Sequence, residues 1–383
     1  MIQPAAESRQ VFLDEQCVST DELTQRAQRV AGALTAMGVK QGDTVALLLR
    51  NDFAFVEATL AAAQLGIYLV PINWHGQAPE VRYVLDDCTP KVLIGHADLL
   101  QALGDALPPE LPVIAVPTSS TGAASSTAAA VAAAAAVTTS AQPFIDWPTW
   151  RAAATPWHGT PPASRASMIY TSGTTGKPKG VRRKPATPEQ AAATAEMFKC
   201  VYGVRPGMRA LVNGPLYHSS PNAFMRNGFA HAELFVMHSR FDAETTLAAI
   251  ARHRITHAVM VPTMFVRLLK LPPEVRARYD VSSLEWVTHT GAPCPVEVKK
   301  ALIDWWGPVV VETYGSTEAG TATVCSSEDW LTRPGTAGRP TPGTPASSYS
   351  TMRVPGVGRP AVPGRVSQSC DEQTVAVPAS VLP

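Results

Sequence analysis

The chain has 383 residues, which is more than one small hydrophobic core can organise and enough for two or three subdomains. Its 32 Lys+Arg against 31 Asp+Glu give a net charge of +1, without the basic excess that binds nucleic acid or an acidic membrane surface. The six cysteines lie far apart without a C-x-x-C pair, which argues against a disulfide framework or a zinc site. Since residues 1–4 are not the start of a signal peptide and no transmembrane segment is evident, we expect a cytoplasmic protein.

The first third of the chain alternates between helical and strand patterns. Ser19-Thr20-Asp21-Glu22 is a capping box, and the apolar spacing after it predicts a helix that ends at Gly38. A strand at 44–49 and a helix at 52–65 follow. Short apolar runs at 67–71, 91–94 and 111–116 then alternate with a helix near 80–85. This alternation predicts the α/β fold class with a mostly parallel sheet.

The segment 119–142 consists almost entirely of Ala, Ser, Thr and Val. Alanine favours helix, but the segment has no large apolar residue and no periodic face. We expect a low-complexity surface insertion, partly helical or disordered, and attach no function to it.

The run from Tyr170 to Gly180 holds three glycines, four Ser/Thr residues and two lysines in eleven positions after the apolar pair at 168–169. Glycine and proline disfavour both helix and core strand, so the run reads as a loop that leaves a strand. Its N–H and O–H donors and its two cations suit a polyphosphate. It is not a Walker A loop, because Pro178 follows Lys177. The alternative is a flexible surface loop.

The alternation resumes after this loop and predicts a second α/β unit. The expected elements are helix 188–201, strands 210–213 and 234–237, helix 243–253, strand 258–261, helix 263–269, strand 284–288, helix 295–306 and strand 309–313. We expect the second unit to stack on the first.

The order Ser172-Gly173-Thr174-Thr175-Gly176-x-Pro178-Lys179-Gly180 after an apolar strand resembles the phosphate loop of the adenylate-forming (AMP-binding) enzymes. These are the acyl-CoA synthetases, the adenylation domains of peptide synthetases and the luciferases. Three further segments are similar to motifs of the same family: 312–318 to its Tyr-Gly-x-Thr-Glu motif, 291–293 to its adenine-contacting turn, and 215–221 to the segment beside its acyl pocket. The resemblance covers roughly residues 13–342 and is closest in character to bacterial fatty-acid or bile-acid CoA ligases.

The resemblance implies an AMP-binding N-terminal domain over residues 1–340, built of two stacked α/β subdomains. It also implies that ATP, Mg²⁺ and the cosubstrate CoA bind. Tyr314 would stack on adenine, Thr317 would contact the α-phosphate, and Glu318 would hold Mg²⁺, a hard cation that prefers oxygen ligands. His218 would gate the acyl pocket and complete the catalytic set with Thr317 and Glu318. The implied cofactor-binding positions are Thr171, Ser172, Gly173, Thr174, Thr175, Gly176, Lys179, Gly291, Ala292, Pro293, Glu312, Tyr314 and Gly315.

Two of these assignments have plain structural alternatives. Residues 291–293 fit an ordinary turn before a helix that starts at Pro295. A lone histidine such as His218 is usually structural, and the chain has neither H-E-x-x-H nor a close Cys/His cluster.

The family activity that the resemblance implies is that of an ATP-dependent acid–CoA ligase. A carboxylate attacks the α-phosphorus of ATP to give an acyl-adenylate and pyrophosphate, and the CoA sulfur then displaces AMP. The acyl pocket would run between His218, Asn222 and the strand near residues 286–290. The apolar neighbours Phe224 and Met225 suggest that the acid is fatty, aromatic or sterol-like.

The family pattern stops after residue 340. No lysine follows Lys300, and residues 341–383 are rich in Pro, Ser, Val and Gly without any period, which predicts a disordered tail. We therefore expect a truncated chain with an incomplete barrel-like subdomain, no C-terminal domain and impaired activity. An offset reading frame or a natural domain split would each explain this pattern. The alternatives in function are a non-catalytic fragment that at most binds ATP and an adenylation domain that feeds a carrier protein.

Overall fold

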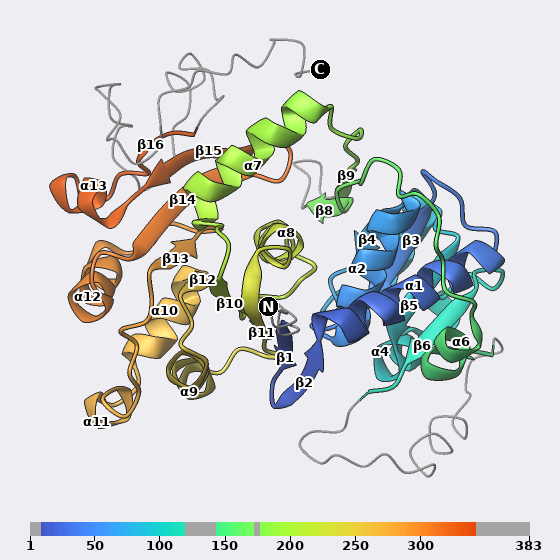
Figure 1. Ribbon diagram of the computed structural model, residues 1–383, viewed down its shortest axis with the longest axis horizontal. Helices are drawn as coiled ribbons and strands as arrows, with labels where there is room; N and C mark the ends of the chain where they lie inside the picture. The colour runs from blue at the N-terminus through green and yellow to red at the C-terminus, as the bar shows by residue number, and fades with distance from the viewer. Residues whose placement is uncertain (1–8, 119–142, 172–176, 342–383) are drawn as a thin grey trace, which may run out of the picture. The chain divides into compact units, whose positions relative to one another are not determined.

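The computed structural model describes residues 9–118, 143–171 and 177–341 (Figure 1). They divide into two compact units, each with its own sheet. Unit 1 contains Val18–Pro185 and Pro215–Ser219, and unit 2 contains Arg9–Cys17, Ala186–Gly214 and the chain from Ser220 onward. The predicted α/β class with two units is confirmed. The expected insertion at 119–142 and the tail after residue 341 lie outside the described residues.

Unit 1 is built around a five-stranded parallel sheet in the order β4-β3-β5-β6-β7. The strands are β3 (Thr44–Leu48), β4 (Tyr68–Pro71), β5 (Val92–His96), β6 (Val113–Val116) and β7 (Ile145–Asp146). The helices are α1 (Thr20–Ala36), α2 (Phe53–Leu65), α3 (Ala78–Cys88), α4 (Ala97–Leu103) and α6 (Trp147–Ala153). A two-stranded antiparallel pair, β8 (Ile169–Thr171) and β9 (Lys179–Val181), completes the unit.

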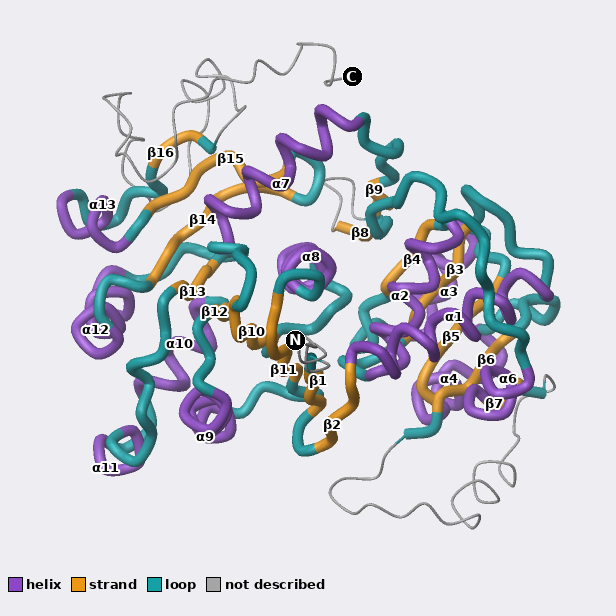
Figure 2. Tube along the Cα trace, in the orientation of Figure 1, coloured by secondary structure: helices purple, strands orange, loops and turns teal. Residues whose placement is uncertain are grey.

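Helices cover both faces of this sheet because the right-handed crossovers from β3 to β4 and from β4 to β5 run in opposite directions along the sheet, which places α2 and α3 on opposite sides. Ala46 and Leu48 belong to the buried cluster that also contains residues of α3 and α4. The alternate residues Val45 and Leu47 are also fully buried. Helix α1 packs against both α2 and α6, and Figure 2 shows helices beside the strands of this unit.

A buried carboxylate joins these three helices. The side chain of Glu57 on α2 is 1% exposed, and its oxygens accept hydrogen bonds from Arg151 on α6 at 2.8 and 2.6 Å. Arg26 on α1 lies 3.4 Å from the same carboxylate. Burial raises the pKa of Glu57, and the two arginines offset part of that rise.

Unit 2 is built around a nine-stranded sheet in the order β16-β15-β14-β13-β12-β10-β11-β1-β2. Its strands are β1 (Gln10–Leu13), β2 (Gln16–Ser19), β10 (Met208–Val212), β11 (Ala232–Met237), β12 (His257–Met260), β13 (Trp286–His289), β14 (Val310–Ser316), β15 (Gly320–Cys325) and β16 (Arg339–Pro340). Strands β1, β11, β10, β12, β13 and β14 run parallel, and β15 and β16 are antiparallel additions at one edge.

Helices pack on both faces of the second sheet as well (Figure 1). One face carries α9 (Ala243–His253), α10 (Pro262–Leu269) and α12 (Val296–Trp306), which share a buried apolar cluster with the strands. The other face carries α7 (Pro188–Tyr202) and α8 (Ser219–Gly228), where the ring of Phe224 lies 5.5 Å from Tyr202 and 6.5 Å from Phe235. The short helices α11 (Pro273–Arg276) and α13 (Ser327–Thr332) complete the unit.

The helices of the described part of the chain include none that is both long enough and apolar enough to cross a membrane.

Candidate functional site

In each sheet there is a point at which the connections that follow two neighbouring parallel strands run in opposite directions. In unit 1 this point lies between β3 and β5, and in unit 2 it lies between β10 and β12. Open α/β sheets bind their ligands outside the carboxyl ends of the strands at such points. The carboxyl edges of the two sheets are therefore where ligand-binding residues are expected.

The predicted phosphate loop starts and ends on the β8–β9 pair of unit 1. Thr171 and Lys179 are direct partners across this pair, so they close the loop between them. The Tyr170 hydroxyl donates to the Asp87 carboxylate on α3, and burial together with this bond raises the pKa of Tyr170. Both ends of the run expected to be loop are strand instead, because each finds its antiparallel partner in the other. Ser172, Gly173, Thr174, Thr175 and Gly176 lie outside the described residues.

The segment with His218 is anchored within unit 1. The backbone N–H of Leu216 donates to the side-chain oxygen of Asn51, at 2.8 Å, just after β3. Tyr217 is buried with its ring edge-on to Trp74, 6.4 Å between centroids. His218 itself is exposed, and partial desolvation by its neighbours, with the nearby His75, lowers the pKa of its ring.

The adenine-binding and Mg²⁺-binding candidates gather on neighbouring strands of unit 2. Gly291, Ala292 and Pro293 are exposed directly after β13, and β14 pairs with β13 in parallel. Tyr314 is half-buried on β14. Thr317 and Glu318 lie in the turn between β14 and β15, where the Ala319 N–H donates to the Ser316 hydroxyl at 3.0 Å. Glu318 is exposed, so its carboxylate sits at the surface of the hairpin.

The strand itself is longer than the sequence predicts. It was expected to end at residue 313, but β14 continues to Ser316 because β15 folds back and pairs with it. Glu312, Tyr314 and Gly315 therefore lie in a strand of a hairpin. Gly315 is required there: a side-chain carbon at this residue would lie 2.2 Å from the carbonyl oxygen of Gly320.

A buried charge pair that the sequence interpretation missed underlies this hairpin. The Lys299 ammonium on α12, with a side chain 0% exposed, donates to a Glu312 carboxylate oxygen at 2.8 Å. His289 on β13 lies 3.6 Å from the same oxygen, and burial, with the charge of Lys299, holds its pKa well below its usual range. The signal in the sequence was the spacing of Lys299 with Leu302, Ile303 and Trp306, which places the lysine on the core-facing stripe of its helix.

Phe224 and Met225, the residues from which a fatty, aromatic or sterol-like acid was inferred, pack in the protein interior. Their side chains are 0% and 1% exposed and lie on the buried face of α8. They therefore give no information on the substrate acid. The assignment of His218, Asn222 and residues 286–290 to an acyl pocket stays a prediction.

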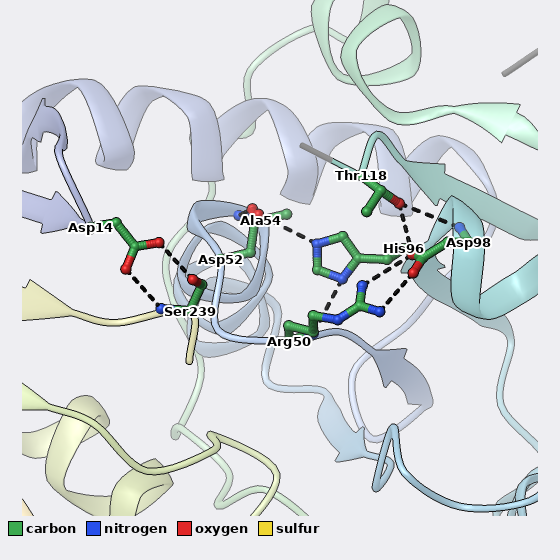
Figure 3. A network of polar contacts seen from close by, with 8 residues as sticks. All are labelled: Asp14, Arg50, Asp52, Ala54, His96, Asp98, Thr118 and Ser239. Atoms are coloured by element: carbon green, nitrogen blue, oxygen red, sulfur yellow. Dashed lines mark hydrogen bonds and ion pairs between the residues drawn. The ribbon is translucent and has the colours of Figure 1, made fainter. Parts of the chain in front are cut away.

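The carboxyl edge of the unit 1 sheet carries a polar network (Figure 3). Arg50, just after β3, donates to both oxygens of Asp98 at 3.0 and 2.6 Å, and Thr118 donates to Asp98 at 2.7 Å. His96, at the end of β5, accepts from the Arg50 backbone N–H at 3.2 Å and lies 3.4 Å from Asp52. Partial burial would raise the pKa of Asp98, but the hydrogen bonds from Arg50 and Thr118 outweigh it and lower the pKa to about 2. A separate pair in unit 2, Asp14 and Ser239, appears in the same view.

We expect the substitution Asp98→Asn to change the acid limb of the stability profile. Because the folded-state pKa lies below the usual value of 3.8, the stabilisation is present above that value and is lost as the pH falls toward 2. The Asp98 side chain is 44% exposed, so solvent screening limits the effect at pH 7 to about 1 kcal/mol or less. Urea unfolding of both proteins between pH 7 and pH 2 measures it, and parallel profiles would contradict it.

The described ranges contain no group of three or more His, Cys, Asp or Glu side chains that could hold a metal ion. The exposed Glu318 carboxylate offers the oxygen donor that Mg²⁺ prefers when phosphate oxygens supply the rest.

Known proteins are similar to this chain in sequence and in fold. The long-chain-fatty-acid–CoA ligase FadD13 of Mycobacterium tuberculosis is 29% identical over 319 residues, 82% of this chain and 58% of that protein. The indoleacetate–CoA ligase of Aromatoleum aromaticum is 29% identical over 349 residues, 89% of this chain and 62% of that protein. The N-terminal domain of FACL13 from M. tuberculosis, solved with an inhibitor, superposes with a TM-score of 0.66 at 26% identity, covering 87% of this chain and 79% of that one.

The chain thus spans about three fifths of the length of these curated relatives. The sequence model of the family described as "AMP-binding enzyme" matches residues 3–348, which include every predicted motif. The chain therefore belongs to the AMP-binding enzyme family.

Proposed function

We propose that this protein acts as an ATP-dependent acid–CoA ligase. A substrate carboxylate attacks the α-phosphorus of ATP and displaces pyrophosphate, giving an acyl-adenylate. The CoA thiol sulfur then attacks the acyl carbon, the C–O bond to AMP breaks, and the thiol proton leaves to solvent or base. Catalysis consists mainly of positioning and of neutralising phosphate charge.

The observation that carries this proposal is the arrangement at the carboxyl edge of the unit 2 sheet. Neighbouring parallel strands present Gly291–Pro293 and the hairpin with Tyr314, Thr317 and Glu318, in a chain that matches the AMP-binding family. Tyr314 would stack on adenine, Thr317 would contact the α-phosphate, and Glu318 would hold the Mg²⁺ that accompanies ATP and neutralises its charge. Lys179 and Thr171, paired at the base of the loop, would face the β- and γ-phosphates.

We infer that the acid is a largely apolar carboxylate, fatty, aromatic or sterol-like, and that the protein works in the cytoplasm. Relatives named for a long-chain fatty acid and for indoleacetate support an acid of this kind. The expected impairment, which rests on the absence of lysine after Lys300, stays a prediction.

The test is an assay of the purified 383-residue chain with Mg-ATP, CoA and a panel of such acids, followed by mass spectrometry of the acyl-CoA product. A thermal melt with and without Mg-ATP accompanies it, since a bound ligand raises the melting temperature by mass action. Acyl-CoA formation supports the ligase and refutes the expected impairment. A Mg-ATP-dependent shift without product would support the alternative, a chain that at most binds ATP.

A further inference from the structure

The ion pair between Lys299 and Glu312 is unusual in its burial. The Lys299 side chain is 0% exposed, and that of Glu312 is 11% exposed. The Lys299 ammonium also lies 5.0 Å from the centre of the Trp330 ring, which is itself 2% exposed. Removing two charges from water costs several kcal/mol per ion, and apolar residues of similar volume often stabilise a protein as well or better. The stability of unit 2 therefore gives no sufficient reason for a lysine at this position.

The place of Glu312 in the sheet supplies another reason. Glu312 is the last residue of β14 that pairs with β13, where its partner is His289. From Thr313 to Ser316 the strand pairs with β15 alone, and the register shifts between Tyr314 and Gly315. The carboxylate thus lies where the strand leaves the body of the parallel sheet. Two residues later comes Tyr314, and Glu318 follows in the turn.

His289 does not provide an alternative anchor for this carboxylate. Its side chain is 0% exposed, and neither ring nitrogen has a hydrogen-bond partner within the described residues. Its ring packs edge-on against Phe265, 5.4 Å between centroids. The charge-assisted hydrogen bond from Lys299, on a helix fixed by Leu302, Ile303 and Trp306, is therefore the strong contact of Glu312.

We propose that Lys299 is a positioning residue: through Glu312 it fixes the point where β14 leaves the sheet, and so places Tyr314 and Glu318 for the nucleotide. This inference rests on the proposed function for its ligand, but the constraint on the hairpin holds without any ligand. It also gives Glu312 a positioning role in place of the direct cofactor contact that the family resemblance implies.

The test compares K299M, the double variant K299M/E312L and the control K300M. Lys300 is the next residue of the same helix, is exposed, and pairs with Asp304 at 2.7 Å, so K300M makes the same substitution without touching the buried pair. The double variant removes both charges together and keeps apolar volume, which protects the experiment if K299M alone fails to fold.

Amide hydrogen exchange followed by mass spectrometry is the first readout. We expect the amides of residues 313–323 to exchange about tenfold faster or more in both Lys299 variants, because the hairpin then opens locally more often. Exchange in β10 and α9 should stay unchanged, because the rest of unit 2 remains folded. The melting temperature of the double variant is expected to recover toward that of the parent while its hairpin stays fast. Uniform acceleration over unit 2, or a double variant with slow hairpin exchange, would show a merely structural pair and overturn the inference.

Mg-ATP affinity is the second readout, measured by calorimetry on the folded proteins. We expect the dissociation constant to rise about tenfold or more in both Lys299 variants and to stay unchanged in K300M. Affinity that follows the melting temperature, lost in K299M and restored in the double variant, would overturn the inference. If the parent binds no Mg-ATP but its hairpin responds as expected, the proposed function fails and the positioning role stands.

Discussion

Replacing Glu57 with glutamine is expected to lower the free energy of unfolding by about 2 kcal/mol, because the amide places an N–H₂ group against the Arg151 guanidinium, which then lacks one of its two acceptors. The Glu57 carboxylate is 1% exposed and holds Arg151 and Arg26, whose side chains are 22% and 28% exposed. The two arginines can turn partly toward water, which limits the loss of unfolding free energy. Urea unfolding at pH 7, followed by circular dichroism and by tryptophan fluorescence, measures it.

The matched control is the substitution Glu22→Gln. Glu22 pairs with the same Arg26, but on the surface of α1 at i,i+4 spacing, where its side chain is 51% exposed. Such pairs contribute about 0.5 kcal/mol or less. Equal small losses for both variants would mean that the buried triad adds no net stability, and would contradict the prediction.

The local signals in the sequence predicted most helices and central strands. Ser19 caps α1 by accepting from the Glu22 N–H at 3.0 Å, and α9 has the bounds that its apolar spacing predicts. Capping residues and apolar periodicity are local features of the sequence, so such elements can be predicted from it. Strand β1 does not: Gln10–Leu13 joins the unit 2 sheet beside Leu234–Met237, more than 200 residues away. A pairing of that range is decided by the assembled sheet and leaves no local pattern.

The order of motif residues indicated where the candidate site lies in the sequence, but not the local structure that surrounds it. The strands β13 and β14 bring residues 291–293 and 312–318 to one edge, as consecutive parallel strands should. The hairpin was missed because β15 has no strong apolar alternation of its own. Lys299 was missed because a lysine is normally read as a surface residue, and only its spacing with buried Leu302 and Trp306 indicates otherwise.

Under the proposed function, the substitution Glu318→Gln is expected to weaken Mg-ATP binding about 100-fold, which corresponds to about 2.7 kcal/mol. The amide keeps the shape of the side chain but removes the negative charge that attracts a hard dication. Glu318 is exposed in the β14–β15 turn, so its replacement should leave the melting temperature without ligand nearly unchanged. Calorimetric titration with Mg-ATP, and with ATP in the presence of a chelator, measures the metal-dependent part.

The substitution Glu328→Gln serves as the control, because it makes the same chemical change at an exposed residue of α13, outside every predicted motif. It should leave Mg-ATP affinity unaltered. If both variants bind equally well, Glu318 does not hold the metal, and the carboxylate must come from elsewhere in the chain. If E318Q loses affinity equally with and without the metal, the hairpin contacts the nucleotide directly. If the Glu318 carboxylate binds Mg²⁺, E318Q should lose affinity for Mg-ATP but not for ATP in the presence of a chelator. Without the metal, the carboxylate and the phosphate oxygens repel each other because both are negatively charged.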